Sequence, residues 1–321
     1  MIILPLFDNF AGKQGQKKGD EMMRALLIEL SRNKWIARRV TKNGWACRMA
    51  RRFVAGETLE DAIGTARRLN SEGLAVSLDY LGEHAQGREA AHCAGLTYLR
   101  ILERIANEGL DANISVKLTQ LGLEVNDDLC EELITSLCVH LRDSSQIVRV
   151  DMEGSAYTQR TINVVKNVLQ RMPSIGIVIQ AYLYRSEHDI EELLKRGCRI
   201  RLCKGAYREK PNIAFPKKRD VDANFLKLMK TLLASGVYHG IATHDENMIE
   251  ATKDFVETRG IKKDAFEFQM LYGIRGDIQK KLVHDGYRVR AYVPYGTEWF
   301  PYFMRRLAER PANLFFLLRN L

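Results

Sequence analysis

Residues 199–207 read RIRLCKGAY, and this stretch decides how the rest of the chain is interpreted. A strand in which bulky and basic residues alternate, and which breaks at a glycine before an aromatic residue, places charged groups at the rim of a sheet. Gly205 lets the backbone approach a ligand, Arg201 offers a planar set of donors, and Tyr207 offers a flat wall. The stretch therefore predicts a binding site, with a buried strand whose basic side chains reach out to solvent as the alternative.

Seven further β-rich runs resemble this one, and amphipathic helical stretches separate them. Together with 199–203, the runs are 75–78, 114–118, 147–150, 175–179, 240–243, 266–270 and 288–293. Eight strands, each followed by a helix, over roughly 250 residues form the pattern of a closed barrel. A doubly wound open sheet is the alternative, but its phosphate-binding motifs GxGxxG and GxxxxGKS or GxxxxGKT are absent from the sequence. The sequence therefore predicts an α/β fold of the (β/α)8 TIM-barrel type.

The first 70 residues contain no convincing strand and are expected to be helical. Residues 21–30 are apolar at helical spacing, and Thr58 with Asp61 forms a capping signal for a helix over 58–69. No Pro-rich or Ser/Gly-rich run marks a linker. We therefore expect residues 1–70 to form an N-terminal helical segment packed on a catalytic barrel of residues 71–321.

Composition bounds the partners and the compartment of this 321-residue chain. Its net charge of +9 suits an anionic partner, which could be a phosphate-bearing cofactor, an acidic lipid surface or nucleic acid. The basic stretch 32–52 is interpreted first as a solvated helical face, then as a membrane surface, and last as a nucleic-acid site. Six cysteines without CxxC or CxxH spacing, and no secretory signal, favour a cytoplasmic protein with reduced thiols. No apolar run reaches the length of about 18 residues that would predict a spanning helix.

Each predicted strand ends in a polar or ionisable residue. Barrel enzymes assemble their sites at the C-terminal ends of their strands, which we call the mouth. Any one of these residues could instead be a rim group bonded to solvent or to a neighbouring loop. Eight polar residues at the ends of eight strands, however, predict a mouth lined by polar side chains. These residues are Asp79, Lys117, Asp151, Gln180, Lys204, His244, Gln269 and Tyr292.

Several chemistries are disfavoured because their motifs are absent from the sequence. There is no GxSxG nucleophile elbow of the serine hydrolases. There is also no HExxH motif, so metal-dependent hydrolysis is not expected and no metal is assigned. Arg305 and Arg306 suit a small carboxylate, and Glu309 lies where it can orient Arg305 on a helix; an ordinary ion-paired surface helix is the alternative. Lys117 or Lys204 could form a Schiff base, so an aldolase-like lyase is a rival function. A basic nucleic-acid or membrane-binding protein is the rival outside enzymes.

The motifs that carry these residues resemble, in order, those of the monofunctional bacterial proline dehydrogenases, an FAD-dependent barrel family also called proline oxidases. The matching segments are 78–83, 115–118, 150–153, 180–182, 201–207, 242–244, 266–269 and 305–309. The resemblance covers residues 74–320, and the chain is too short for the fused bifunctional form. It implies a flavoenzyme that oxidises L-proline to Δ1-pyrroline-5-carboxylate by hydride transfer from C5 to FAD N5. Electrons would then pass to a membrane quinone, in the first step of proline catabolism to glutamate.

The resemblance also implies a binding site for FAD. Arg201 would lie against the isoalloxazine ring near N5, where a fixed cation raises the flavin potential, and would be catalytic together with Asp151. Cys203 stands where the family commonly has valine. The implied flavin contact at this position is made by the backbone, so it does not depend on the side chain. The implied cofactor contacts are Met152, Gln180, Arg201, Cys203, Lys204, Gly205, Thr243 and His244.

For the substrate, the resemblance implies a carboxylate clamp and a wall around the pyrrolidine ring. Arg305 and Arg306 would bind the proline carboxylate, with Lys117 as a third cation. Release of the amine proton to bulk water and its transfer to a side chain both stay open. The implied wall is Tyr207, Leu271 and Tyr292, with Asp151 bonded to the Tyr292 hydroxyl, and the supporting residues are Glu83, which would pair with an active-site arginine on closure, and Glu309.

Residues 312–321 are apolar at helical spacing. Packing under the barrel or against a second copy is the favoured interpretation, which leaves an oligomer open. The alternative is peripheral attachment to the inner face of the cytoplasmic membrane, near the quinone. The expected partners are therefore L-proline and a membrane quinone, and not nucleic acid.

Overall fold

The computed structural model describes residues 35, 39–40, 48–142, 146–207 and 209–309, with only the backbone described at 307–309. The chain divides into two units, Ala55–Gly296 and a second unit that combines Met1–Val54 with Thr297–Leu321. The helix expected at 21–30, most of the basic stretch 32–52 and the apolar end 312–321 lie outside the described residues. The helix expected at 58–69 is present and belongs to the first unit. The division into an N-terminal segment 1–70 and a catalytic barrel 71–321 stays a prediction.

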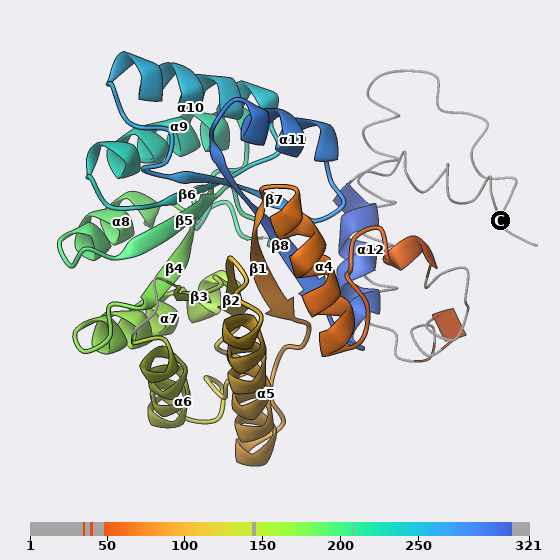
Figure 1. The fold of residues 1–321 in the computed structure, drawn as a ribbon. Helices are drawn as coiled ribbons and strands as arrows, with labels where there is room; N and C mark the ends of the chain where they lie inside the picture. The colour runs from red at the N-terminus through yellow and green to blue at the C-terminus, as the bar shows by residue number, and fades with distance from the viewer. Residues whose placement is uncertain (1–34, 36–38, 41–47, 143–145, 208, 310–321) are drawn as a thin grey trace, which may run out of the picture. The chain divides into compact units, whose positions relative to one another are not determined.

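Eight parallel strands close into a barrel in the order of the sequence (Figure 1). β8 pairs with β1, with Arg290 opposite Ala75, and this pairing closes the sheet. The (β/α)8 prediction is confirmed, and each of the eight predicted runs overlaps a strand. The strands are β1 Ala75–Tyr80, β2 Ala112–Val116, β3 Val148–Val150, β4 Ile175–Gln180, β5 Arg199–Cys203, β6 Gly240–Ala242, β7 Glu267–Leu271 and β8 Arg288–Tyr295.

Helices follow the strands along the chain and surround them (Figure 1). The helix α4, Leu59–Ser71, precedes β1 and packs against β1 and β8. Its predicted capping box is present, because Asp61 N donates to Thr58 Oγ1 and Thr58 N donates to Asp61 Oδ2. The helices after β1 to β7 are α5 Arg88–Asn107, α6 Asp127–His140, α7 Ser155–Leu169, α8 Ser186–Leu194, α9 Lys218–Ala234, α10 Glu246–Thr258 and α11 Gly276–His284.

Side chains alternate along the strands between an apolar and a polar environment. Val76 and Leu202 are fully buried in the apolar layer between strands and helices. Ser77 on β1, Ser115 on β2 and Arg201 on β5 face the opposite way, since they bond to one another across the barrel. Most barrels of this type fill their interior with branched apolar residues. Here the outer layer supplies the hydrophobic core, and the interior holds charged and hydroxyl groups.

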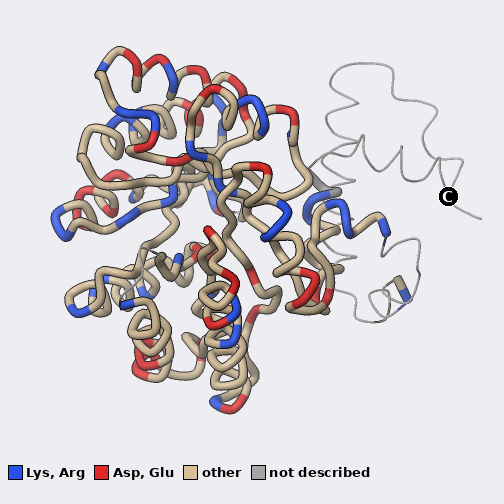
Figure 2. Tube along the Cα trace, viewed as in Figure 1, with Lys and Arg blue, Asp and Glu red and all other residues tan. Residues whose placement is uncertain are grey.

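Positions of Lys or Arg and positions of Asp or Glu are mixed along the outer helices (Figure 2). Some of these charges form ion pairs between neighbouring segments, such as Arg160 on α7 with Asp127 on α6, and Arg171, just after α7, with Glu131 on α6. Exposed pairs of this kind contribute about 0–1 kcal/mol each, so they add little to the stability of the barrel. Within the described ranges, no helix combines the length and apolar character needed to cross a bilayer.

The second unit contains α12, Trp299–Glu309. The Phe303 ring packs between aromatic neighbours, with centroids 6.0 Å from Trp299 and 6.1 Å from Phe53. The helix also carries Arg305 and Arg306, and the Arg306 guanidinium lies over the Tyr302 ring.

Candidate active site

The guanidinium of Arg201 lies in the polar interior, and four side chains accept hydrogen bonds from it. Nη1 donates to Asp151 Oδ1 at 2.9 Å and to Ser115 Oγ at 3.1 Å. Nη2 donates to Ser77 Oγ at 3.2 Å, and Nε donates to Gln269 Oε1. Only 5% of Arg201 is exposed. Because bonds from several strands restrain one buried side chain, its positive charge has a defined position.

Asp151 joins Arg201 to Tyr292. The Tyr292 hydroxyl donates to Asp151 Oδ2 at 2.7 Å, which is the bond that the resemblance implies. The Arg201 guanidinium also lies 5.2 Å from the centroid of the Tyr292 ring, within the range of a cation–π interaction. Burial and the charge of Asp151 raise the pKa of Tyr292 well above its ordinary value, so the phenol keeps its proton at neutral pH. The carboxylate therefore has a cation on one oxygen and a hydroxyl on the other.

Lys117 forms a second buried ion pair beside this cluster. Its Nζ lies 2.9 Å from Asp79 Oδ1, and the two side chains are 10% and 1% exposed. Burial alone would lower the pKa of Lys117, but the charges of Asp79 and Asp151 outweigh burial and hold it above its ordinary value. The amine is therefore protonated at neutral pH, and a protonated amine cannot attack a carbonyl. This pairing argues against Lys117 as a Schiff-base nucleophile.

Lys204 belongs to a different cluster from Arg201. Its Nζ donates to Asp245 Oδ2 at 2.7 Å and also to Asp222. Asp245 caps α10, Asp222 lies near the start of α9, and Lys218 pairs with both carboxylates. The amine of Lys204 is therefore held near the N-termini of two helices, and the predicted flavin contact of Lys204 is one through its backbone.

The turn after β5 passes closely over an aromatic ring. Gly205 has φ +112°, and a Cβ on it would lie closer than 3.0 Å to the ring of Tyr182. Only glycine fits this position without strain. Farther along the same loop, Glu209 accepts hydrogen bonds from Ser155 N at 2.7 Å and Ser155 Oγ at 2.6 Å, at the start of α7. The loop that carries Tyr207, which is 41% exposed, is thus bonded to the start of α7 through Glu209.

On the β3 and β4 side of the mouth, the predicted cofactor residues are buried. Gln180 is 3% exposed and its Nε2 donates to the backbone oxygen of Glu153 at 3.0 Å, which orients the amide. Met152 is also buried. At the end of β5, burial raises the pKa of the Cys203 thiol to about 12, so this thiol stays protonated. A protonated thiol does not act as a nucleophile, which leaves Cys203 with the backbone contact implied by the resemblance.

On the β6 and β7 side, backbone bonds hold Thr243 and His244. Thr243 N donates to Gln269 O at 3.2 Å, and its hydroxyl accepts from Asp245 N at 3.1 Å. His244 Nε2 accepts from Leu271 N at 2.8 Å, so in the neutral ring the proton is on Nδ1. This bond also fixes the position of Leu271, one of the predicted substrate residues.

Other predicted residues are not gathered at Arg201 by the described contacts. Glu83 is exposed, on the loop after β1. Arg305 and Arg306 are on α12, in the second unit, and the side chain of Glu309 lies outside the described residues. Their contact with substrate therefore stays a prediction.

The structure adds Ser77, Ser115 and Glu267, which were given no role from the sequence, and it shows the partners of Gln269, which was predicted at the end of its strand. Ser77, Ser115 and Gln269 all bond to Arg201, and Glu267 bonds to Gln269. A signal for them is present in the sequence, since polar residues stand two positions apart within single strands. The pairs are Ser77 with Asp79, Ser115 with Lys117, Arg149 with Asp151, and Glu267 with Gln269. Apart from Arg201, the strand residues considered had been those at strand ends, and this period of two indicates a polar inner face.

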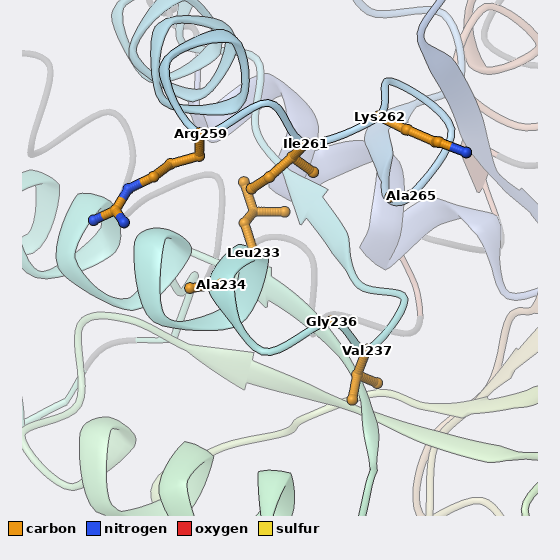
Figure 3. A pocket seen from close by; sticks show the side chains of 8 residues that line it. All are labelled: Leu233, Ala234, Gly236, Val237, Arg259, Ile261, Lys262 and Ala265. Carbon is orange, nitrogen blue, oxygen red and sulfur yellow. The ribbon is translucent and has the colours of Figure 1, made fainter.

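A pocket of about 440 Å³ lies at the other end of the barrel, where α9 and α10 end and the chain turns toward β6 and β7 (Figure 3). None of the predicted site residues lines it. Its lining consists of Leu233, Ala234, Gly236, Val237, Arg259, Ile261, Lys262 and Ala265. Among the residues that the structure describes, no three His, Cys, Asp or Glu side chains are grouped to hold a metal ion.

Comparisons with known proteins match most of the chain. The profile of the proline dehydrogenase family matches residues 62–319. Proline dehydrogenase 1 of Bacillus subtilis subsp. natto is 42% identical over 300 residues, covering 94% of this chain and 99% of the relative. The proline dehydrogenase of Deinococcus radiodurans is 36% identical over 309 residues, covering 94% and 98%.

A solved structure gives the same result for the fold. It is proline utilization A (PutA) from Bdellovibrio bacteriovorus, inactivated by N-propargylglycine. It is 26% identical to this chain with a TM-score of 0.78, and the match covers 91% of this chain. The chain spans 37% of the length of that PutA chain, so the likeness concerns one part of the larger protein.

Proposed function

The chain belongs to the proline dehydrogenase family and is an enzyme of proline catabolism, and we propose that it oxidises L-proline to Δ1-pyrroline-5-carboxylate with FAD as cofactor. Flavin binding is typical of the family. The observation that carries the proposal is the buried guanidinium of Arg201, restrained by side chains from several strands in the mouth of the barrel.

The residues present fit a flavin. Arg201 supplies a fixed cation, and Gln180, whose amide is already oriented, is on the neighbouring strand. Gly205 carries no side chain, so its backbone can approach a ligand closely. The residues that would hold the cofactor are Met152, Gln180, Arg201, Cys203, Lys204, Gly205, Thr243 and His244.

Bound FAD would supply the acceptor, at N5, for the hydride that leaves C5 of proline. Arg201 then contributes a positive charge that is positioned before the reaction, which favours negative charge developing nearby. Asp151 keeps this guanidinium in place and holds the Tyr292 hydroxyl at the same time. Because these groups are buried and bonded to one another, little reorganisation is needed during the reaction.

For the substrate, we propose that Lys117, Arg305 and Arg306 bind the carboxylate of proline. The protonated state of Lys117 supports its part in this role. Tyr207, Leu271 and Tyr292 would enclose the ring and exclude water. Glu83 and Glu309 would support the arginines when the site closes.

A membrane quinone is the proposed electron acceptor, with the protein on the cytoplasmic side and attached peripherally. The support is in the sequence, where a basic stretch at 32–52 and an apolar stretch at 312–321 suit an anionic membrane surface. Photoreduced enzyme should be reoxidised by a quinone analogue, and binding to anionic vesicles should weaken with salt. Reoxidation by oxygen alone would contradict the quinone assignment.

The Schiff-base lyase is the rival that the geometry disfavours, because both candidate lysines are held by carboxylates. One experiment separates the two functions: the visible spectrum of the purified protein, recorded before and after anaerobic addition of L-proline. We expect flavin bands that bleach with proline. Bands that do not bleach would remove proline as the substrate, and no bands after reconstitution with FAD would refute the flavin site. Borohydride trapping of a carbonyl substrate on Lys117 or Lys204 would then support the lyase.

A further inference from the structure

Gln269 uses both ends of its side-chain amide inside the barrel. Its Oε1 accepts from Arg201 Nε, and its Nε2 donates to Glu267 Oε1. The exposed fractions of Glu267 and Gln269 are 1% and 4%, so water does not compete for these bonds. The chemistry of the partners decides which end faces which, because an ionised carboxylate can only accept and Arg201 Nε can only donate.

Glu267 is itself held by two further residues. Arg290 Nε donates to Glu267 Oε1 at 2.8 Å, and the Tyr238 hydroxyl donates to Oε2 at 3.0 Å. Burial alone would raise the pKa of Glu267, but the charge and hydrogen bond of Arg290 outweigh burial and hold it below its ordinary value. Glu267 is therefore ionised at neutral pH and accepts from the amide of Gln269.

The neighbouring strand leaves space for this arrangement. Gly240 on β6 pairs with Glu267 on β7, and a Cβ at Gly240 would lie closer than 3.0 Å to Gln269 Nε2. A larger residue would displace the amide from between its two partners. The absence of a side chain at Gly240 is thus a second observation that the position of Gln269 is built into the sheet.

We propose that Gln269, oriented by Glu267, is a positioning residue for Arg201. By accepting from Nε, it restrains the edge of the guanidinium that faces β7, while Asp151, Ser77 and Ser115 restrain the other edge. The orientation of the guanidinium plane is then determined from both sides. The inference rests on the proposed function, since Arg201 acts there as the cation beside the flavin.

The test compares Gln269→Met with Glu267→Gln and a matched control, Tyr238→Phe. Gln269→Met removes the acceptor at similar length, and Glu267→Gln removes the charge that orients the amide. Tyr238→Phe removes a different bond to Glu267 and leaves the bond between Gln269 and Arg201. We expect Gln269→Met to lower kcat roughly 10- to 100-fold, the factor carried by one hydrogen bond to a charged group, with a smaller change in KM. The midpoint potential of the bound flavin should fall in the same variant.

A second readout needs no flavin. Hydrogen exchange at Arg201 Nε, followed by nitrogen-15 NMR in the flavin-free protein, should be faster in Gln269→Met and in Glu267→Gln than in wild type, and unchanged in Tyr238→Phe. Unchanged exchange, kcat and potential in Gln269→Met, with only a lower Tm, would overturn the proposal. If that variant does not fold, wild-type exchange and potential in Glu267→Gln would overturn it instead. Failure of the proposed function would appear separately, as wild-type protein that binds no flavin or does not react with proline.

Discussion

The hydroxyl of Tyr292 donates to Asp151 Oδ2 at 2.7 Å, although the two residues are 141 positions apart in the sequence. The other oxygen of Asp151 accepts from Arg201. One carboxylate therefore links the end of β3 to β5 and β8, and connects the predicted flavin cation with a predicted wall of the substrate site.

Removal of the Tyr292 hydroxyl should lower stability and weaken proline binding. Tyr292→Phe deletes a hydrogen bond to a charged acceptor, which contributes about 1.5–3 kcal/mol to the free energy of unfolding. The pair between Asp151 and Arg201 remains, so flavin content should be unchanged while the KM for proline rises. Urea unfolding and steady-state kinetics measure the two effects.

Tyr98→Phe is the control for this variant. The Tyr98 hydroxyl is buried and donates to Gln120 Oε1 at 2.8 Å, which is a neutral acceptor. Such a bond contributes about 0.5–1.5 kcal/mol, so the loss of stability should be smaller than in Tyr292→Phe. Equal losses in the two variants would show that Asp151 is not charged in the folded protein.

Alanine at Gly205 should destabilise the protein more than alanine at Gly87. Both glycines have positive φ, +112° and +96°, and so both substitutions carry a backbone cost of about 1–3 kcal/mol. A Cβ at Gly87 would meet nothing within 4 Å, whereas at Gly205 it would meet the Tyr182 ring. Overpacking should add about 1–3 kcal/mol at Gly205 alone, measurable by urea unfolding. A difference near zero would mean that the Tyr182 ring moves aside.

The buried ring of His239 should make the protein less stable in acid. Burial lowers the pKa of His239 to about 3, and its Nδ1 accepts from Ile200 N at 3.0 Å. Below the unfolded-state pKa of about 6.5, the unfolded chain therefore binds a proton that the folded chain does not. As the pH is lowered, this group should reduce the free energy of unfolding by about 1.4 kcal/mol per pH unit, until the pH nears the folded-state pKa. The measurement is the free energy of unfolding in urea at several pH values between 6 and 4. In His239→Asn this free energy should fall less steeply with decreasing pH than in wild type, by about 1.4 kcal/mol per pH unit.

His84 provides a contrast of opposite sign. Partial burial would lower its pKa, but the hydrogen bond and charge of Glu124, 2.8 Å from Nδ1, outweigh burial and raise it. This pair stabilises the folded state fully below the unfolded-state pKa and stops doing so as the pH rises through the folded-state pKa. His84→Asn should therefore lose stability at low pH and little at high pH. An identical pH profile for the His84 and His239 variants would contradict both assignments.

Arg305→Met tests the predicted carboxylate clamp. Loss of a charged hydrogen bond to the substrate should lower kcat/KM about 10- to 100-fold, mainly through a higher KM for proline. Flavin content should not change, because the substitution removes no predicted cofactor contact. Arg100→Met, at an exposed position of α5, is the control for removing an arginine and should behave as wild type. Loss of flavin with an unchanged KM would instead move Arg305 to the cofactor.

The sequence alone was sufficient for the order and type of the elements described. The alternation of residue types in strands such as β5 and β8 is a local property, and so is the capping box of Thr58 with Asp61; both are present in the structure. The motifs also identified the family, because each is a short contiguous segment. Alternation further indicated which residues share a face, although Arg201 was considered as a site residue within its strand and the other strand residues were those at strand ends.

Tertiary structure alone decided which charges meet. Lys204 follows β5 in the sequence as a candidate for the mouth, yet its amine pairs with Asp222 and Asp245 from two helix starts. Arg201 reaches Ser77, 124 positions away, because closure of the barrel brings β1 and β5 to face each other across one interior. The physical reason is range: periodicity follows from the geometry of neighbouring residues, whereas the partner of a buried charge depends on the closed path of all eight strands.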